Sequence, residues 1–183
     1  MSQVYQELEE IFNGGASEEY LGEDVKLVEH MLQCADLAKS AGAPAHLVVA
    51  ALLHDIGHLL VDEAGSAHES RIDLHHDEVG ARWVAERFPG TVSEPVRLHV
   101  AAKRYLITTQ HDYLSHLSHA SVQTLYMQGG PLTQDEVIDF ISREGAEDAV
   151  QLRLWDDAAK VRDKSTSLLR DFEDLINALA ISK

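Results

Sequence analysis

The run ALLHDIGHLL, residues 51–60, places His54, Asp55 and His58 within an otherwise apolar segment. If this segment is a buried helix, an imidazole beside a carboxylate is costly unless each polar atom finds a partner. A bound cation would be a partner for the imidazole and the carboxylate at once. The run therefore indicates a metal site in the core, provided that other parts of the chain supply the remaining ligands.

Further candidate ligands recur at regular intervals. The gaps are 24 residues from position 30 to 54, 21 from 55 to 76, 23 from 76 to 99 and 57 from 99 to 156. An interval of this length is about one helix plus one connection, so antiparallel helices could each send one ligand to a common centre. Nitrogen and oxygen ligands without a thiolate suit iron, manganese or cobalt better than a structural zinc. The candidate ligands are His30, His54, Asp55, His76, His99 and Asp156.

Asp55 follows His54 directly, so its side chain points about 100° further around a helix and could bridge two ions. Taken singly, each candidate has an ordinary interpretation: Asp156 as a solvated carboxylate, or His76 as a residue beside a helix N-cap. Only the combination predicts a metal centre. His75 is the alternative ligand to its neighbour His76. The acidic pair Asp77 and Glu78, which leads into a helix, favours His76.

Helical periodicity along the chain supplies the elements that would position these ligands. Helices are expected over 23–41, 45–60 (the central buried helix), 76–88, near 112–127, 133–143, 147–162 and 166–180, with one more starting near Ser93 or Glu94 and carrying Pro95 in its first turn. Residues 61–75 lose the periodicity and predict a loop near the site, and the tail at 166–180 is expected to pack on the core.

The composition predicts one compact all-α domain over residues 1–183, a helical bundle with the metal centre in its core. Apolar residues make up 45% of the chain, and there are only four prolines. A net charge of −16 argues against nucleic acid as a partner. The single cysteine, the absence of a signal-like N-terminus and the absence of an apolar span predict a cytoplasmic protein without membrane attachment. The oligomeric state stays open.

At the ligand positions the chain resembles the HD superfamily, defined by the pattern H…HD…D, and its two extra histidines resemble the two-metal subset. Most HD proteins are phosphohydrolases. Five longer stretches look like the phosphonate-cleaving di-iron oxygenases of the PhnZ-like group, and the likeness runs from about residue 20 to 163. These stretches are YLGEDVKLVEHMLQCA (20–35), LLHDIGH (52–58), HVAAKRYL (99–106), SVQTLYMQGGPL (121–132) and RLWDDAAK (153–160).

This resemblance implies two iron ions, as an Fe(II)/Fe(III) pair, that use O₂ to cleave the carbon–phosphorus bond of a small organophosphonate. One iron would be held by the positions matching His30, His54, Asp55 and Asp156, and the other by Asp55, as bridging ligand, with His76 and His99. Iron suits this chemistry because redox-inert zinc cannot generate the oxidant.

The resemblance also implies an anion pocket for the phosphonate. Its members are His58, Lys103, Ser121, Thr124, Gln128 and Arg153. Helical spacing agrees in part, because Lys103 lies one turn from His99 and Arg153 lies one turn from Asp156. The ordinary alternatives are a solvated helix face for the polar stripe of Ser121, Thr124 and Gln128, and a surface charge for Lys103. We interpret the neighbouring Arg104 as a surface charge.

By the same resemblance, Tyr20 is a gate that covers the second iron until substrate displaces it, and Glu23 receives the amino end of the substrate. Asp24 adds a second acid, and paired acids suit a trimethylammonium group, which has no N–H to donate. The sequence thus favours (R)-1-hydroxy-2-(trimethylammonio)ethylphosphonate as substrate, with glycine betaine and phosphate as products.

Three other functions stay open at this point. The first is a glycine-forming oxygenase acting on 2-amino-1-hydroxyethylphosphonate. The second is an HD phosphohydrolase that uses metal-activated water. The third is a non-catalytic ligand sensor that keeps the metal site as a scaffold.

Overall fold

The computed structural model describes residues 2–20, 22–61 and 75–181, with the side chain of Val61 excepted, and within them the chain is helical. The ten α-helices assigned there are α1 (Gln3–Gly14), α2 (Leu27–Ser40), α3 (Ala45–Leu53), α4 (Ile56–Val61), α5 (His76–Ala85), α6 (Gly90–Thr109), α7 (His119–Met127), α8 (Gln134–Ser142), α9 (Ala146–Ala158) and α10 (Glu173–Leu179). Short 3₁₀ helices cover Tyr113–His116 and Leu169–Phe172. The predicted all-α class is confirmed.

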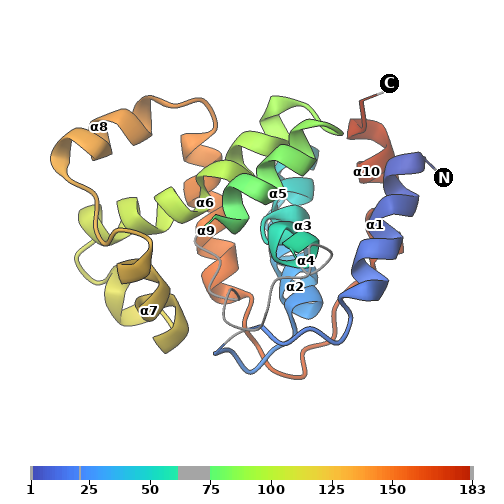
Figure 1. Ribbon diagram of the computed structural model, residues 1–183, viewed down its shortest axis with the longest axis horizontal. Helices are drawn as coiled ribbons and strands as arrows, with labels where there is room; N and C mark the ends of the chain where they lie inside the picture. Colours follow the sequence, from blue (N-terminus) through green and yellow to red (C-terminus); the bar gives the residue numbers. More distant parts are fainter. Residues whose placement is uncertain (1, 21, 62–74, 182–183) are drawn as a thin grey trace.

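Helix α3 lies at the centre of the bundle and packs against α2, α6, α9 and α10. Seven consecutive residues of α3, Leu47–Leu53, are buried, as expected for a helix that is apolar on every face. Figure 1 shows α1 and α10 side by side near both chain ends, while α7 and α8 lie at the opposite end of the view, below and above the end of α6. His30, His99 and Asp156 therefore come from helices that pack around α3, whereas His76 comes from α5, which packs against α4 and α6.

The predicted central helix over 45–60 is two helices in the structure, because α3 ends at Leu53 and α4 starts at Ile56. The break allows α4 to pack against α5 at very short range. A Cβ atom added at Gly57 would lie 2.0 Å from the carbonyl oxygen of His76, so a glycine is required at this approach. The contact fixes the start of α5, and with it His76, beside the turn that carries Asp55.

Other boundaries differ for local reasons. Helix α6 begins at Gly90, earlier than predicted, so Pro95 lies inside the helix and not in its first turn. The predicted helix near 112–127 divides at Ser118, whose hydroxyl caps α7 by accepting from the Ser121 amide. The helix expected near 147–162 ends at Ala158. Most of the predicted loop over 61–75 lies outside the described residues.

The N-terminal helix α1 was not predicted, although it buries Tyr5, Leu8 and Phe12 along one face. The predicted packing of the tail on the core is confirmed, since Phe172 and Ile176 are fully buried and α10 contacts α1 and α3. Among the described residues, no helix is both long enough and apolar enough to cross a membrane.

Candidate metal centre

Four predicted histidines form two pairs in the buried centre of the bundle. The Nε2 atoms of His30 and His54 lie 3.0 Å apart, and those of His76 and His99 lie 3.1 Å apart. An ion about 2.1 Å from two nitrogens at a right angle would separate them by about 3.0 Å. Each pair therefore has the spacing of two ligands of one ion.

The backbone fixes which ring nitrogen is available. The Nδ1–H groups of His30, His54 and His99 donate to the carbonyl oxygens of Ala159, Ala51 and Val96, at 3.0, 2.8 and 2.6 Å. A carbonyl oxygen can only accept, so the proton of each neutral ring is on Nδ1 and the Nε2 lone pair faces the centre. Two lone pairs at 3.0 Å repel unless a cation lies between them.

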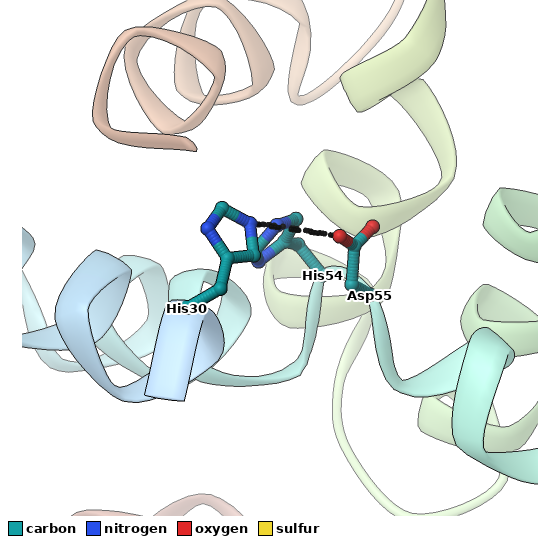
Figure 2. Close-up of side chains that lie close together, drawn as sticks. All are labelled: His30, His54 and Asp55. Atoms are coloured by element: carbon teal, nitrogen blue, oxygen red, sulfur yellow. Dashed lines mark hydrogen bonds and ion pairs between the residues drawn. The ribbon is translucent and has the colours of Figure 1, made fainter. Parts of the chain in front are cut away.

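Asp55 lies between the two pairs. Its Oδ2 atom is 3.6 and 3.3 Å from the Nε2 atoms of His30 and His54, and its Oδ1 atom is 3.4 and 3.5 Å from those of His76 and His99. Figure 2 shows the Asp55 carboxylate pointing toward His30 and His54 from the turn after α3. One carboxylate thus offers one oxygen to each pair, which is the arrangement of a bridging ligand.

The donor atoms form two buried groups that could each hold an ion: His30, His54 and Asp55, and Asp55, His76 and His99. Asp156 adds an oxygen to the first group, with Oδ1 at 3.4 Å from His30 Nε2 and 4.0 Å from His54 Nε2. Asp55 Oδ2 and Asp156 Oδ1 are buried and have no hydrogen-bond partner among the described residues. A cation is the partner that such buried acceptors lack, so the residues fit a centre of two metal ions.

Both carboxylates are ionised in this environment. Burial raises the pKa of the Asp55 carboxyl, but the charge of a protonated His54 beside it outweighs burial and holds that pKa well below its usual range. Burial in turn lowers the pKa of His54, but the Asp55 carboxylate outweighs burial and raises that pKa, so in the absence of a metal ion a proton takes the place of the cation between the two side chains. Burial also raises the pKa of the Asp156 carboxyl, but the Arg153 guanidinium at 2.7 Å keeps that pKa well below its usual range. The centre therefore offers two negative charges to bound cations.

A buried lysine adjoins the centre. Lys103 is only 2% exposed, and its Nζ donates to Thr124 Oγ1 at 2.9 Å. Burial, followed by the charge of Arg153, lowers the pKa of Lys103 to about 7. The His58 ring stacks on His76 with centroids 4.0 Å apart. These three predicted anion-pocket residues, Lys103, Thr124 and His58, lie around the metal centre.

Arg153 lies behind Asp156. Its Nη1 donates to Asp156 Oδ2 at 2.7 Å, while Nη2 and Nε contact the Asp157 carboxylate and Nε also reaches Tyr113 Oη at 3.4 Å. The guanidinium therefore fixes the orientation of a candidate ligand. Asp157 and Tyr113, which complete this network, were not among the predicted residues.

The Tyr20 ring stacks on His30, with centroids 4.4 Å apart and an interplanar angle of 16°. Burial, and then the nearby Asp55 and Asp156 carboxylates, raise the pKa of the Tyr20 phenol well above its usual range. The gate residue predicted for the second ion thus stacks on a ligand of the first group in this structure, with its phenol protonated.

The two predicted acids at the amino end have different surroundings. The Glu23 side chain is 9% exposed, accepts from Ser118 Oγ and forms an ion pair with Lys160 at 3.0 Å. Asp24 is exposed and forms no hydrogen bond or ion pair within the described part of the chain. The structure brings Glu23 to the site and leaves Asp24 at the surface. Lys160, which also donates to Ser121 Oγ at 2.9 Å, was missed by the sequence analysis.

The predicted stripe on α7 ends in a structured turn. Gln128 is the C-cap of α7, and its Oε1 atom is buried without a hydrogen-bond partner among the described residues. Arg104, interpreted from the sequence as a surface charge, donates from Nε to the Gly130 carbonyl at 2.7 Å and contacts Gly129. It therefore holds the turn that follows Gln128.

Comparisons with known proteins agree with this geometry. The HD domain family model matches residues 27–128. A 1-hydroxy-2-(trimethylamino)ethylphosphonate dioxygenase of Leisingera caerulea, described as glycine-betaine-forming, is 41% identical over 156 residues, or 85% of this chain and 80% of that protein. A hydroxymethylphosphonate dioxygenase of Gimesia maris is 42% identical over 154 residues, or 84% of this chain and 77% of that protein.

Proposed function

The chain belongs to the HD-domain family and is related to its phosphonate dioxygenases, and on that premise we propose that it is a di-iron dioxygenase that cleaves the carbon–phosphorus bond of a 1-hydroxyphosphonate. The observation that carries the proposal is Asp55, which offers one oxygen to each of two histidine pairs. The likeness to the two dioxygenase relatives extends over most of this chain.

Two iron ions would be held by the first group with Asp156, and by the second group through the shared Asp55. They would supply the redox chemistry that removal of a C–H hydrogen and reduction of O₂ require, and that zinc cannot supply. The histidines contribute neutral nitrogen donors, and the two aspartates contribute charge. Arg153 keeps Asp156 ionised and oriented.

The phosphonate would be bound by Lys103 with Thr124, and by His58, Ser121 and Gln128. Among the described residues, the hydrogen-bond partner of the Lys103 ammonium is the Thr124 hydroxyl at 2.9 Å. An ammonium that is 2% exposed is a strong partner for a phosphonate oxygen in a site with little water. Rotating the Gln128 side-chain amide by 180° exchanges its oxygen and nitrogen, which are distinguished only by their hydrogen bonds. In the rotated orientation the amide nitrogen replaces the unpartnered Oε1 and can donate to the anion.

The substrate that we favour is (R)-1-hydroxy-2-(trimethylammonio)ethylphosphonate. With one O₂ it gives glycine betaine, phosphate and a proton. Its cation would meet the Tyr20 ring and the Glu23 carboxylate, and an aromatic face with a carboxylate is the chemistry that holds quaternary ammonium groups. The primary-amine analogue and hydroxymethylphosphonate are the competing substrates, and the second of these is named for a relative of nearly equal identity.

The test is phosphate release by anaerobically iron-loaded protein, with and without O₂, on these three phosphonates in parallel. We expect release only with O₂, fastest for the trimethylated compound. Substitution of Lys103 by alanine should raise KM for all three, because each of them presents a phosphonate to this lysine.

Two results would overturn parts of the proposal. Phosphate release from a phosphomonoester without O₂, and from no phosphonate, would make the protein an HD phosphohydrolase. O₂-dependent release that is fastest for hydroxymethylphosphonate would keep the dioxygenase and remove the cationic substrate.

A further inference from the structure

Lys160 occupies an unusual place at the edge of the metal centre. Its Nζ atom is 3.0 Å from Glu23 Oε1 and 2.9 Å from Ser121 Oγ, and it lies 5.6 Å from the centre of the Tyr20 ring. The side chain is 11% exposed. A positive charge is therefore held against a carboxylate and an aromatic face, with little water.

These same groups are the ones that would receive the cationic end of the substrate under the proposed function. Glu23 supplies the negative charge and Tyr20 the aromatic ring. A trimethylammonium group and the Lys160 ammonium carry the same charge, so they cannot both be neutralised by the one Glu23 carboxylate. Among the described residues, the ion-pair partner of Glu23 is Lys160.

We propose that the Lys160 ammonium is an internal competitor for the substrate's cation: it occupies the cation subsite in the free enzyme and is displaced when a trimethylammonium group binds. This inference rests on the proposed function, because it concerns the cation end of the same site. It makes Lys160 a residue that determines specificity between phosphonates that carry a cationic group and phosphonates that do not.

The position of Lys160 allows the displacement. The residue follows the end of α9 at Ala158, so its backbone is outside the helix, and its four-carbon stem can carry the ammonium toward water. Its second anionic neighbour, Asp156, is 4.0 Å away and already paired with Arg153. Displacement therefore exchanges one cation for another at Glu23 and leaves Asp156 partnered.

A competitor of this kind raises the apparent dissociation constant of the cationic ligand. When a subsite is free in only a fraction of the molecules, the apparent dissociation constant rises by the inverse of that fraction. Removing the Lys160 charge should therefore tighten the binding of a cation. Lys160 is not among the candidate metal ligands, but it does donate to Ser121 of the proposed phosphonate site. A cation without a phosphonate therefore reports on this subsite alone.

The first experiment measures choline binding to the iron-loaded, anaerobic protein by calorimetry. Choline carries the trimethylammonium group without the phosphonate, so no turnover is needed. Lys160→Met should bind choline roughly three- to tenfold more tightly than wild type. Lys164→Met, which removes an exposed lysine a few residues further along, should bind like wild type.

Glu23→Gln completes the cycle. In that background the choline affinity should be weak and the added Lys160→Met should produce no gain, since the competitor acts through Glu23. Unchanged or weaker choline binding by Lys160→Met would overturn the inference and would assign Lys160 to orienting Glu23. Absence of O₂-dependent phosphate release from every phosphonate would instead overturn the proposed function.

A measurement on the wild type covers the case in which the variants fold poorly. Acylation of lysines, followed by mass spectrometry, should show Lys160 protected in the free enzyme and several-fold more reactive with saturating choline. Lys164 should not respond, and hydroxymethylphosphonate, which has no cation, should not expose Lys160. Continued protection of Lys160 with choline bound would contradict the displacement.

Discussion

The Nε2 atoms of His30 and His54 lie 3.0 Å apart while both Nδ1–H groups are already donated to backbone carbonyls. Neither nitrogen can donate a proton to the other as long as both rings are neutral. The pair is thus an arrangement that only a cation, or an added proton, makes favourable. The same close approach recurs between His76 and His99, at 3.1 Å.

Asp55→Ala should remove both metal ions, because each histidine pair loses the oxygen that faces it. The loss of affinity should exceed the roughly 10- to 100-fold that follows from losing an outer-shell partner. Iron per chain after gel filtration measures this. His99→Ala is the matched control and should lose only the ion of the second group. Two ions retained by Asp55→Ala would contradict the bridging role.

Gly57→Ala should displace the start of α5 and loosen the second ion more than the first. The added Cβ would meet the His76 carbonyl oxygen at 2.0 Å, and a backbone atom of this kind cannot move aside as the end of a flexible side chain can. We expect about 1–3 kcal/mol of destabilisation in thermal melts, with loss of one ion. Gly90→Ala adds a Cβ in open space and should keep both ions. Equal behaviour of the two variants would show that α5 tolerates the shift.

The pH dependence of substrate capture should follow Lys103. Its pKa is lowered to about 7, so the side chain is charged below that pH and neutral above it in the free enzyme. An ammonium binds a phosphonate oxygen better than an amine does, so kcat/KM should fall as pH rises through about 7.

The arginine of Lys103→Arg stays charged over this pH range, so the variant should not show the fall in kcat/KM that deprotonation of Lys103 causes. The informative quantity is the ratio of kcat/KM for wild type to that for Lys103→Arg between about pH 6 and 9, since ionisation of the substrate cancels in the ratio. A ratio that does not decline with pH would remove Lys103 from the phosphonate grip.

Asp24→Asn and Glu23→Gln separate the two acids near Tyr20. Asp24 is exposed, and its charge acts on a bound cation only through solvent, so KM for the trimethylated phosphonate should change by no more than about twofold. Glu23→Gln should raise that KM far more, with little effect on hydroxymethylphosphonate. A large effect of Asp24→Asn would restore the paired-acid argument from the sequence.

That these histidines and aspartates meet in the core could be predicted from the sequence because their spacing matches helix-plus-connection units, and because a histidine and an aspartate inside an apolar run need a partner such as a cation. The break between α3 and α4 could not be predicted, because the contact that it allows, between Gly57 and His76, involves a segment that comes later in the chain. Helical periodicity carries no information about such contacts.

Lys160 and the network of Arg153 with Asp157 and Tyr113 were missed for a related reason. Each depends on a side chain finding a partner from a distant segment, as Lys160 finds Glu23. In the sequence, Lys160 is one of many charged residues at the end of a helix. The motifs also gave no indication of hydroxymethylphosphonate, the compound named for the Gimesia maris relative, which carries no cationic group.

The carbonyl oxygens that accept from His30, His54 and His99 belong to the peptide backbone. A side-chain substitution cannot delete an acceptor of this kind, whereas it can delete a carboxylate in the same role. A side-chain substitution therefore does not remove the hydrogen bonds that set the electron-donating strength of these three imidazoles. A substitution among the side chains around the centre would then leave these three hydrogen bonds in place.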